Sequence, residues 1–424
     1  MFPNVSNRSV SAWLGDCRVS LALLALFALL LGRFWWFGET TSWAGFIRIC
    51  LFLGMLLALF QWRRLLPFLR GNGYALLLLG FLVYLASNSL LLGDGKTARR
   101  VLLLIAFFLA VPLVVARGQS ALRQLLALMV VASVLVAIIT FATLNNQGLL
   151  SFEYRLRSIS ASGVAGFADF ENSVLAGLEL AFSGVVMLWV LLQARTWPAR
   201  AFWIGCGLFI AFYVFLTFSR TGWLALAVSA LVLLFNIADR RLRSYMPIAI
   251  ALLGLLFVAL FHERITYELF SRKLSSRDEI WQMVLQLLPG HWLFGYGADT
   301  SVAQTLGFRP LAGSEPMLIA HAHSIYLEVL FNYGLFGLFY FVVLLLAACR
   351  RLYIHRREPL TLLWLAVLLG AMVAMVFDFS SFVSTPNLLW LWLWLPLAWA
   401  LPLPLKATVD AAVTNSNSTV RSLP

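Results

Sequence analysis

Two histidines, His321 and His323, lie in the segment HAHSIYLEVLFNYG, where a long polar stretch meets an apolar run. An imidazole titrates near neutral pH, so either side chain could take a proton from a substrate hydroxyl. The H-x-H spacing could also suggest a metal, but no cysteine or tight carboxylate cluster completes such a site, and we predict none. A structural role, in which the ring holds the loop by a hydrogen bond, stays open for both residues.

Two carboxylates occupy comparable positions at the edges of apolar runs. Glu328 lies about one turn inside the run that follows the histidines, and Asp378 lies at the outer end of a later run. An acid at such a place is either a buried, hydrogen-bonded structural group or part of a functional site. The sequence leaves both interpretations equally open.

Arg220 lies in the motif FSRTG, a connection of only a few residues between two short apolar runs. Its guanidinium must lie at a membrane interface, where an arginine costs solvation free energy unless it reaches water, pairs with an acid or binds an anion. We favour an anion contact, and an anchor that reaches the water is the alternative.

Arg277 lies in the segment SSRDEIWQMVLQLLPG, where Ser276 and Glu279 form a capping-box pattern that predicts a helix beginning at Arg277. Apolar residues then recur at helical spacing until Pro289, which predicts an amphipathic helix on the membrane or over the bundle. A cation is unfavourable in the first turn of a helix unless a phosphate binds at the free N–H groups there. Pairing of Arg277 with a neighbouring carboxylate is the alternative.

The elements that position these residues are membrane helices. The chain has 424 residues, 62% hydrophobic and 12% charged, and its mean hydropathy is +0.90. Soluble domains carry about 25% charged residues, so the composition excludes a secreted enzyme, a cytosolic globular protein and a disordered protein. An all-α polytopic membrane protein remains. Apolar runs of about 20 residues predict twelve spans, near 20–37, 44–61, 74–93, 100–116, 125–145, 173–194, 201–218, 222–238, 245–261, 323–347, 360–379 and 387–405.

Orientation follows from the excess of cations in cytoplasmic loops. With the N-terminus in the cytoplasm, the inner segments hold 18 of the 31 Lys and Arg residues, with clusters in ADRRLRS and CRRLYIHRRE. Both termini are then cytoplasmic, and the first span is a retained anchor. The four cysteines fall in the membrane or on the cytoplasmic side, so we expect no disulfide.

Eleven cations face outward in this topology. The formal net charge of +13 therefore reflects topology and outward-facing cations, and it does not indicate nucleic-acid binding. Arg155 and Arg157 lie in a Gly- and Ser-rich external loop that could close over a substrate. Solvation or pairing with nearby acids explains four cations of the long loop as well as binding does, namely Arg264, Arg272, Lys273 and Arg309. The others are Lys96, Arg99, Arg100, Arg220 and Arg277.

The order of these motifs resembles the O-antigen ligase and polymerase superfamily. FSRTG is followed by a long external loop with S-S-R-D-x-x-W and P-G-x-x-x-x-G-Y-G, and then by H-x-H-S-x-Y-L-E-x-x-x-x-x-G-x-x-G. The resemblance is strongest from about Phe218 to Gly337, and beyond that it rests on the number and layout of the spans. Ser324 differs from the Asn that many relatives carry, and the loop around Phe170 lacks a clear Asn-Pro-Asn-like turn.

The resemblance implies a GT-C type glycosyltransferase of a Gram-negative inner membrane. Such a ligase moves O-antigen polysaccharide from undecaprenyl pyrophosphate to a sugar of the lipid A–core oligosaccharide on the periplasmic face. We expect it to need no cofactor, to bind no nucleic acid and to contact membrane lipids. Its domains would be helices 1–9 over 1–261 with a periplasmic loop near 146–172, an active-site loop over 262–322, helices over 323–405 and a disordered tail over 406–424.

The residue chemistry fits such a reaction, because the departing pyrophosphate develops negative charge that fixed arginines stabilise. We assign Arg220 and Arg277 to the pyrophosphate and His323 to the acceptor hydroxyl as general base, with His321 as alternate. We expect no metal and a direct displacement with inversion. Lys96, Arg99 and Arg100 are candidates to hold phosphates of the acceptor lipid. The remaining candidates for substrate binding are Arg155, Arg157, Arg264, Arg272, Lys273, Glu328 and Asp378.

Three other functions stay open. An O-antigen polymerase would use another undecaprenyl-linked glycan as acceptor, and a protein oligosaccharyltransferase would use a protein. A lipid-linked glycan transporter would place its charges at the bilayer midplane, and only Arg33 and Arg48, which fall inside the first two spans, favour it.

Overall fold

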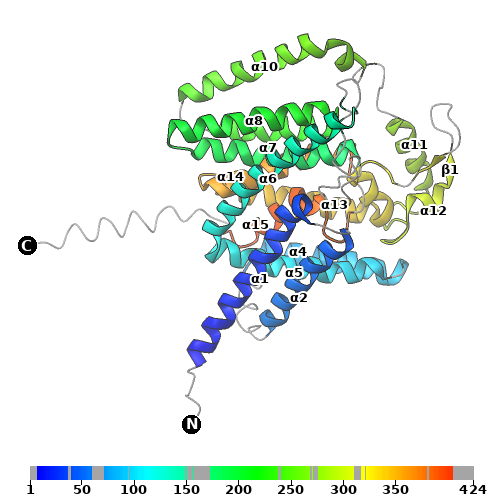
Figure 1. Ribbon diagram of the computed structural model, residues 1–424. Helices are drawn as coiled ribbons and strands as arrows, with labels where there is room; N and C mark the ends of the chain where they lie inside the picture. The colour runs from blue at the N-terminus through cyan, green and yellow to red at the C-terminus, as the bar shows by residue number, and fades with distance from the viewer. Residues whose placement is uncertain are drawn as a thin grey trace, which may run out of the picture.

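The computed structural model describes residues 7–36, 40–59, 71–93, 95–148, 150, 156, 172–236, 240–267, 270, 276–309, 317–319, 321–379 and 382–403. The first half of this part is a succession of helices (Figure 1): α1 (Asn7–Trp35), α2 (Thr40–Leu59), α4 (Gly73–Leu92), α5 (Lys96–Arg117), α6 (Gln119–Asn146), α7 (Ser173–Gln193), α8 (Trp197–Leu216), α9 (Arg220–Phe235) and α10 (Arg240–Thr266).

The second half adds short elements of the long loop and then the last helices. They are α11 (Arg277–Leu287), α12 (Val302–Leu306), β1 (Phe308–Arg309), β2 (Met317–Leu318), α13 (Ile325–Ile354), α14 (Pro359–Phe377), the π-helical η3 (Trp390–Trp394) and α15 (Leu395–Ala400). β1 and β2 form one antiparallel pair, with Phe308 opposite Leu318. In Figure 1, α11, α12 and β1 gather at one end of the bundle, so the loop elements share one face of the molecule.

The prediction of an all-α polytopic membrane protein is confirmed. Each predicted span overlaps a helix, and nine of the described helices are long and apolar enough to cross a membrane. Two shorter apolar helices, Arg220–Phe235 and Trp390–Ala400, coincide with two further predicted spans. The count of twelve, the GT-C assignment and the domain boundaries stay predictions.

The C-terminal helices form the centre of the bundle. α14 packs against α9, α13 and α7, and the fully buried tryptophans belong to α14, η3 and α15. The indole of Trp399 donates to Thr361 Oγ1 at 3.1 Å, and the ring of Trp392 meets Phe182 of α7 edge-on at 5.6 Å. Large aromatic side chains contribute most to such a core, so these helices hold the elements around them in place.

The long loop is fixed to α13 at a break in that helix. Gly334 has a φ of 68°, and a Cβ there would collide with the carbonyl of Leu293. The break frees the N–H of Leu335, which donates to the carbonyl of Trp292 at 2.7 Å. Two bonds run the other way, from Tyr296 and Gly297 to the carbonyls of Phe331 and Asn332. The motifs P-G-x-x-x-x-G-Y-G and G-x-x-G therefore form one backbone unit, which brings the loop beside the histidine segment.

The amphipathic helix begins at Arg277 as predicted, but the capping box is wrong. Ser276 has a φ of 59° and its side chain makes no capping bond. A serine reaches the free N–H groups of the first turn only from an extended backbone, which the left-handed conformation of Ser276 excludes. Ile280 and Val284 are buried in a small apolar cluster with loop residues and Phe331 of α13, so α11 packs on the loop elements and on α13.

Candidate functional site

A cavity of about 640 Å³ brings together residues from the two halves of the chain. Arg277 of α11 and the histidine segment form one wall, α1, α2 and α7 form another, and residues 378, 379 and 384–389 close a third. The polar lining consists of Arg33, Thr41, Arg48, Asn172, Glu179, Arg277, His321, His323, Asp378, Ser384, Thr385 and Asn387.

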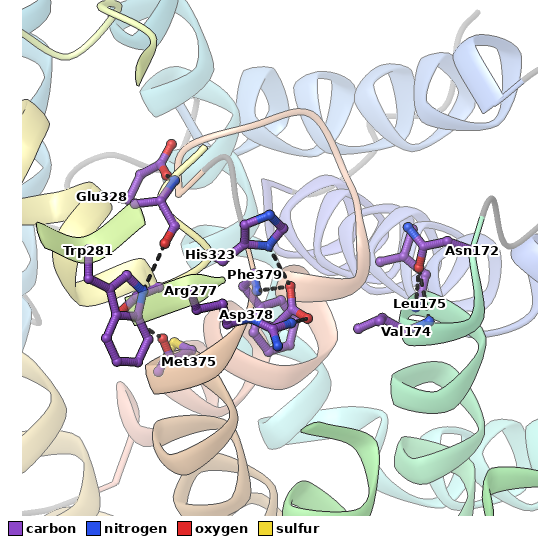
Figure 2. Close-up of polar contacts among 12 residues, drawn as sticks. Asn172, Val174, Leu175, Arg277, Trp281, His323, Glu328, Met375, Asp378 and Phe379 are labelled. Atoms are coloured by element: carbon purple, nitrogen blue, oxygen red, sulfur yellow. Dashed lines mark hydrogen bonds and ion pairs between the residues drawn. The ribbon is translucent and has the colours of Figure 1, made fainter. Parts of the chain in front are cut away.

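Asp378 lies between a cation and an imidazole in this cavity (Figure 2). Its Oδ2 is 3.1 Å from Nη2 of Arg277, and its Oδ1 is 3.8 Å from Nδ1 of His323. Asp378 and Arg277 are only 14% and 16% exposed, so solvent screens their pair less than a surface ion pair. The 3.8 Å separation is an electrostatic contact that a shift of about 1 Å would turn into a hydrogen bond. The carboxylate of Asp378 thus lies between a guanidinium and an imidazole and can balance positive charge on either of them.

The backbone at both ends of this contact adopts unusual conformations. His323 has a φ of 51°, and Phe379, whose N–H donates to Asp378 Oδ1 at 2.9 Å, has a φ of 71°. A non-glycine residue in the left-handed region costs of order 1 kcal/mol and persists where the surrounding structure enforces it, commonly at functional sites. Asp378 itself ends α14, since its N–H donates to the carbonyl of Ala374 at 3.0 Å.

Three side chains fix the turn that carries the histidines. Trp281 of α11 donates from Nε1 to the carbonyl of Ala322 at 3.1 Å, and the N–H of Ala322 donates to Glu328 Oε2 at 3.4 Å. Ser324 Oγ donates to the carbonyl of Met375 at 3.5 Å. Glu328 therefore contacts the backbone between the two histidines, which supports a positioning role.

His321 lies against His323, with 4.2 Å between the ring centroids. Burial lowers the pKa of His321 below its ordinary value, the charges of His323 and Arg277 lower it further, and Asp378 opposes the shift. His321 is therefore neutral at neutral pH and can accept or donate a hydrogen bond beside the second imidazole.

The wall formed by α1, α2 and α7 contains three charged residues that were not predicted as site residues. Glu179 of α7 was missed, and Arg33 and Arg48 were noted only as cations within spans. All three line the same cavity as Arg277. The missed signal was a lone carboxylate inside an apolar run, which marks a functional candidate by itself.

Arg220 is not among the described residues that line the cavity. It begins α9, after Ser219, whose Oγ accepts from the N–H of Gly222 at 3.2 Å. The turn packs so closely on α7 that a Cβ at Gly177 would lie 2.6 Å from Cβ of Ser219. Arg220 therefore sits beside the helix that carries Asn172 and Glu179 into the cavity.

The cations at the start of α5 lie outside the cavity lining as well. Asp299 accepts from the N–H of Thr97 at 2.8 Å and caps this helix, on which Lys96 and Arg99 are exposed. Arg100 donates from Nη1 to the carbonyl of Val383 at 3.2 Å, in the segment that borders the cavity. Arg155, Arg157, Arg272 and Lys273 lie outside the described residues, as do the side chains of Arg264 and Arg309.

The arrangement suits proton transfer next to a bound anion. Arg277 gives one nitrogen to Asp378, whereas its buried Nε donates to no described residue. The guanidinium can therefore bind phosphate oxygens while it stays paired. In the described part of the chain, no group of three or more His, Cys, Asp or Glu residues is arranged to hold a metal ion.

The segment that carries several of these residues is similar to known proteins. Residues 205–342 match a family model described as O-Antigen ligase, a segment that includes Arg220, Arg277 and both histidines. An O-antigen ligase of Pseudomonas aeruginosa is 32% identical over 175 residues, which are 41% of this chain and 40% of the relative. The chain thus matches about two fifths of that relative's length. The predicted resemblance to O-antigen ligases is confirmed.

Proposed function

We propose that this membrane protein is an O-antigen ligase that transfers O-antigen polysaccharide from undecaprenyl pyrophosphate to the lipid A–core oligosaccharide. The family relationship supports a glycosyl-transferring enzyme, and the position of Asp378 between Arg277 and His323 carries the mechanism. We place the protein in a Gram-negative inner membrane, with the cavity on the periplasmic side.

In this mechanism His323 acts as the general base. Its Nδ1 faces Asp378, which favours the tautomer with the proton on Nδ1 and leaves the Nε2 lone pair for the acceptor hydroxyl. As the hydroxyl oxygen attacks the anomeric carbon, its proton passes to Nε2, and the bond from that carbon to the pyrophosphate oxygen breaks. Asp378 stabilises the imidazolium that forms. Direct displacement inverts the anomeric configuration.

Arg277 stabilises the leaving group. We assign Arg277 to the departing undecaprenyl pyrophosphate, whose negative charge grows in the transition state, because its Nε has no partner among the described residues. We assign Arg220 a second contact to this pyrophosphate on the strength of its place in FSRTG, at the start of a helix that packs on α7. The loop cations Arg155, Arg157, Arg264, Arg272 and Lys273 remain proposals for the glycan or acceptor, as do Lys96, Arg99 and Arg100.

One assay tests the proposal. Purified protein is mixed with undecaprenyl pyrophosphate-linked O-antigen and rough lipopolysaccharide in the presence of a chelator, and we expect glycan on lipid A–core with inverted anomeric configuration by NMR. His323→Ala, Arg277→Ala and Arg220→Ala should abolish transfer. Arg123→Ala is the matched control, because Arg123 pairs with Glu358 at 3.4 Å and does not line the cavity.

The same assay separates the alternatives. Elongation of the lipid-linked glycan without transfer to core would indicate a polymerase, and glycan on added protein would indicate an oligosaccharyltransferase. Full activity in all three variants would refute the site assignment.

A further inference from the structure

Among the described residues that line the cavity, Glu179 alone has a buried carboxylate to which the proposed reaction gives no role. It is 2% exposed, and its Oε1 accepts no hydrogen bond from any described residue. A buried carboxylate oxygen without a donor costs free energy, so such an atom at the edge of a cavity is prepared for a donor from outside the protein.

Helical geometry places Glu179 on the face of α7 that meets the cavity. Asn172, Leu175 and Glu179 are spaced by three and four residues, which puts them along one side of a helix, and all three line the cavity. The side-chain oxygen of Asn172 caps α7 by accepting from Val174 and Leu175 (Figure 2). The side-chain nitrogen of Asn172 remains available as a donor to a ligand in the cavity.

The helices α1 and α2, which share this wall with α7, contribute cations and an indole. Arg33 interacts electrostatically with Glu179, and its guanidinium lies 5.6 Å from the ring centroid of Trp43. Arg48 uses its Nε for the carbonyl of its own Ala44 at 3.2 Å, and its terminal nitrogens make no bond that involves another described residue. This wall therefore presents one unused acceptor among several donors and an aromatic ring.

The chemistry of this wall fits a saccharide better than a phosphate. A carboxylate repels phosphate, whereas it accepts strongly from hydroxyl groups, which also accept from arginine and asparagine. The anomeric carbon joins the sugar to the pyrophosphate, so a sugar ring must lie in the same cavity as Arg277. Within a cavity of about 640 Å³, the wall across from the phosphate site is the place for that ring.

We propose that Glu179 is a sugar-binding residue, whose carboxylate accepts a hydrogen bond from a hydroxyl group of the saccharide next to the reacting bond. Arg33 holds the carboxylate in place, and Arg48 and Asn172 donate to neighbouring hydroxyls. This inference rests on the proposed function and adds to it a determinant of sugar specificity. The hydroxyl belongs either to the first sugar of the donor or to the terminal sugar of the acceptor.

Binding measurements on the full-length protein in nanodiscs distinguish these sources. The ligands are bare undecaprenyl pyrophosphate, the same lipid carrying the glycan, and rough lipopolysaccharide. We expect Glu179→Leu to weaken the binding of one saccharide ligand by about tenfold or more, since a hydrogen bond to a charged group is lost. The binding of bare undecaprenyl pyrophosphate should weaken by less than about twofold. Loss on the glycan-carrying lipid assigns the donor sugar, and loss on lipopolysaccharide assigns the acceptor sugar.

Glu179→Gln keeps the shape of the side chain and a weaker acceptor, and it serves if the leucine variant does not fold. Its expected loss on the same saccharide is about fivefold. The matched control is Ser183→Ala, one turn further along α7, where the buried Oγ also has no partner among the described residues but does not line the cavity.

Two results would overturn the inference. One is unchanged binding of both saccharides in both Glu179 variants, and the other is an equal loss on bare undecaprenyl pyrophosphate. Failure of the proposed function looks different, because the wild-type protein would then transfer no glycan to lipid A–core.

Discussion

The indole nitrogen of Trp281 lies 3.1 Å from the carbonyl oxygen of Ala322, and this bond ties α11 to the turn between the two histidines. The same helix presents Arg277 to Asp378, one turn earlier. One short helix therefore contacts both Asp378, through Arg277, and the turn that carries the histidines, through Trp281.

Trp281→Phe should lower kcat by roughly fivefold and leave donor affinity unchanged. The variant keeps the aromatic packing but loses one hydrogen bond worth about 1 kcal/mol, so the histidine turn is held less firmly. Trp189→Phe is the control, because it removes a comparable indole bond to the carbonyl of Pro359, away from the cavity. Equal effects of the two substitutions on kcat would contradict this positioning role.

Asp378→Asn should lower kcat by about a hundredfold, the lower range for a disabled general base. The amide has nearly the same shape as the carboxylate but cannot stabilise an imidazolium at His323 or balance the charge of Arg277. Single-turnover transfer measured across pH separates chemistry from product release. Wild-type rates and an unchanged pH profile would show that Asp378 takes no part.

Acidification should destabilise the protein through His321. Burial holds the pKa of His321 below its ordinary value of 6.5, so at lower pH the unfolded chain binds a proton that the folded protein binds less readily. The stability contributed by this group is fully present above about pH 6.5 and is lost as the pH falls through the folded-state pKa. Thermal unfolding in detergent at about pH 7.5 and pH 5.5 measures the loss. His321→Gln should reduce the difference between the two midpoints, and an undiminished difference would count against this origin.

Gly334→Ala should destabilise the fold by about 3 kcal/mol or more and remove activity. The backbone there has a φ of 68°, and an added Cβ would collide with the carbonyl of Leu293. Gly54→Ala is the control, since a Cβ in that helix meets nothing within 4 Å. Thermal midpoints and transfer rates of the two variants are compared. Similar stability in both would mean that the loop does not depend on the helix break.

The spans could be predicted because their signal is local. An apolar run of about 20 residues is visible without knowledge of its neighbours, and each predicted run overlaps a helix. The start of α11 at Arg277 could also be predicted from the residues around it. The capping box failed because Ser276 has a left-handed backbone, a conformation that the pattern of residue types does not reveal.

The sequence also allowed His323, Arg277 and Asp378 to be named as candidates, but it could not predict that they lie next to one another. His323 and Asp378 are separated by a whole membrane helix and its return, and no periodicity relates them. Glu179 was missed because its neighbours are those of an ordinary span. The interpretation of Arg33 and Arg48 as possible transport charges arose for the same reason, since only the packing of α1, α2 and α7 shows that they face the cavity.

The cavity is lined by residues from both the first two helices and the last part of the described chain, and this has a consequence for biosynthesis. Arg33 and Arg48 enter the membrane early, whereas Asp378 and the segment up to Leu389 are made only after more than 300 further residues. At ordinary rates of translation this interval is of the order of tens of seconds. A chain that ends before Leu389 lacks part of the cavity lining, so under the proposed function it could not yet transfer polymer from its lipid carrier.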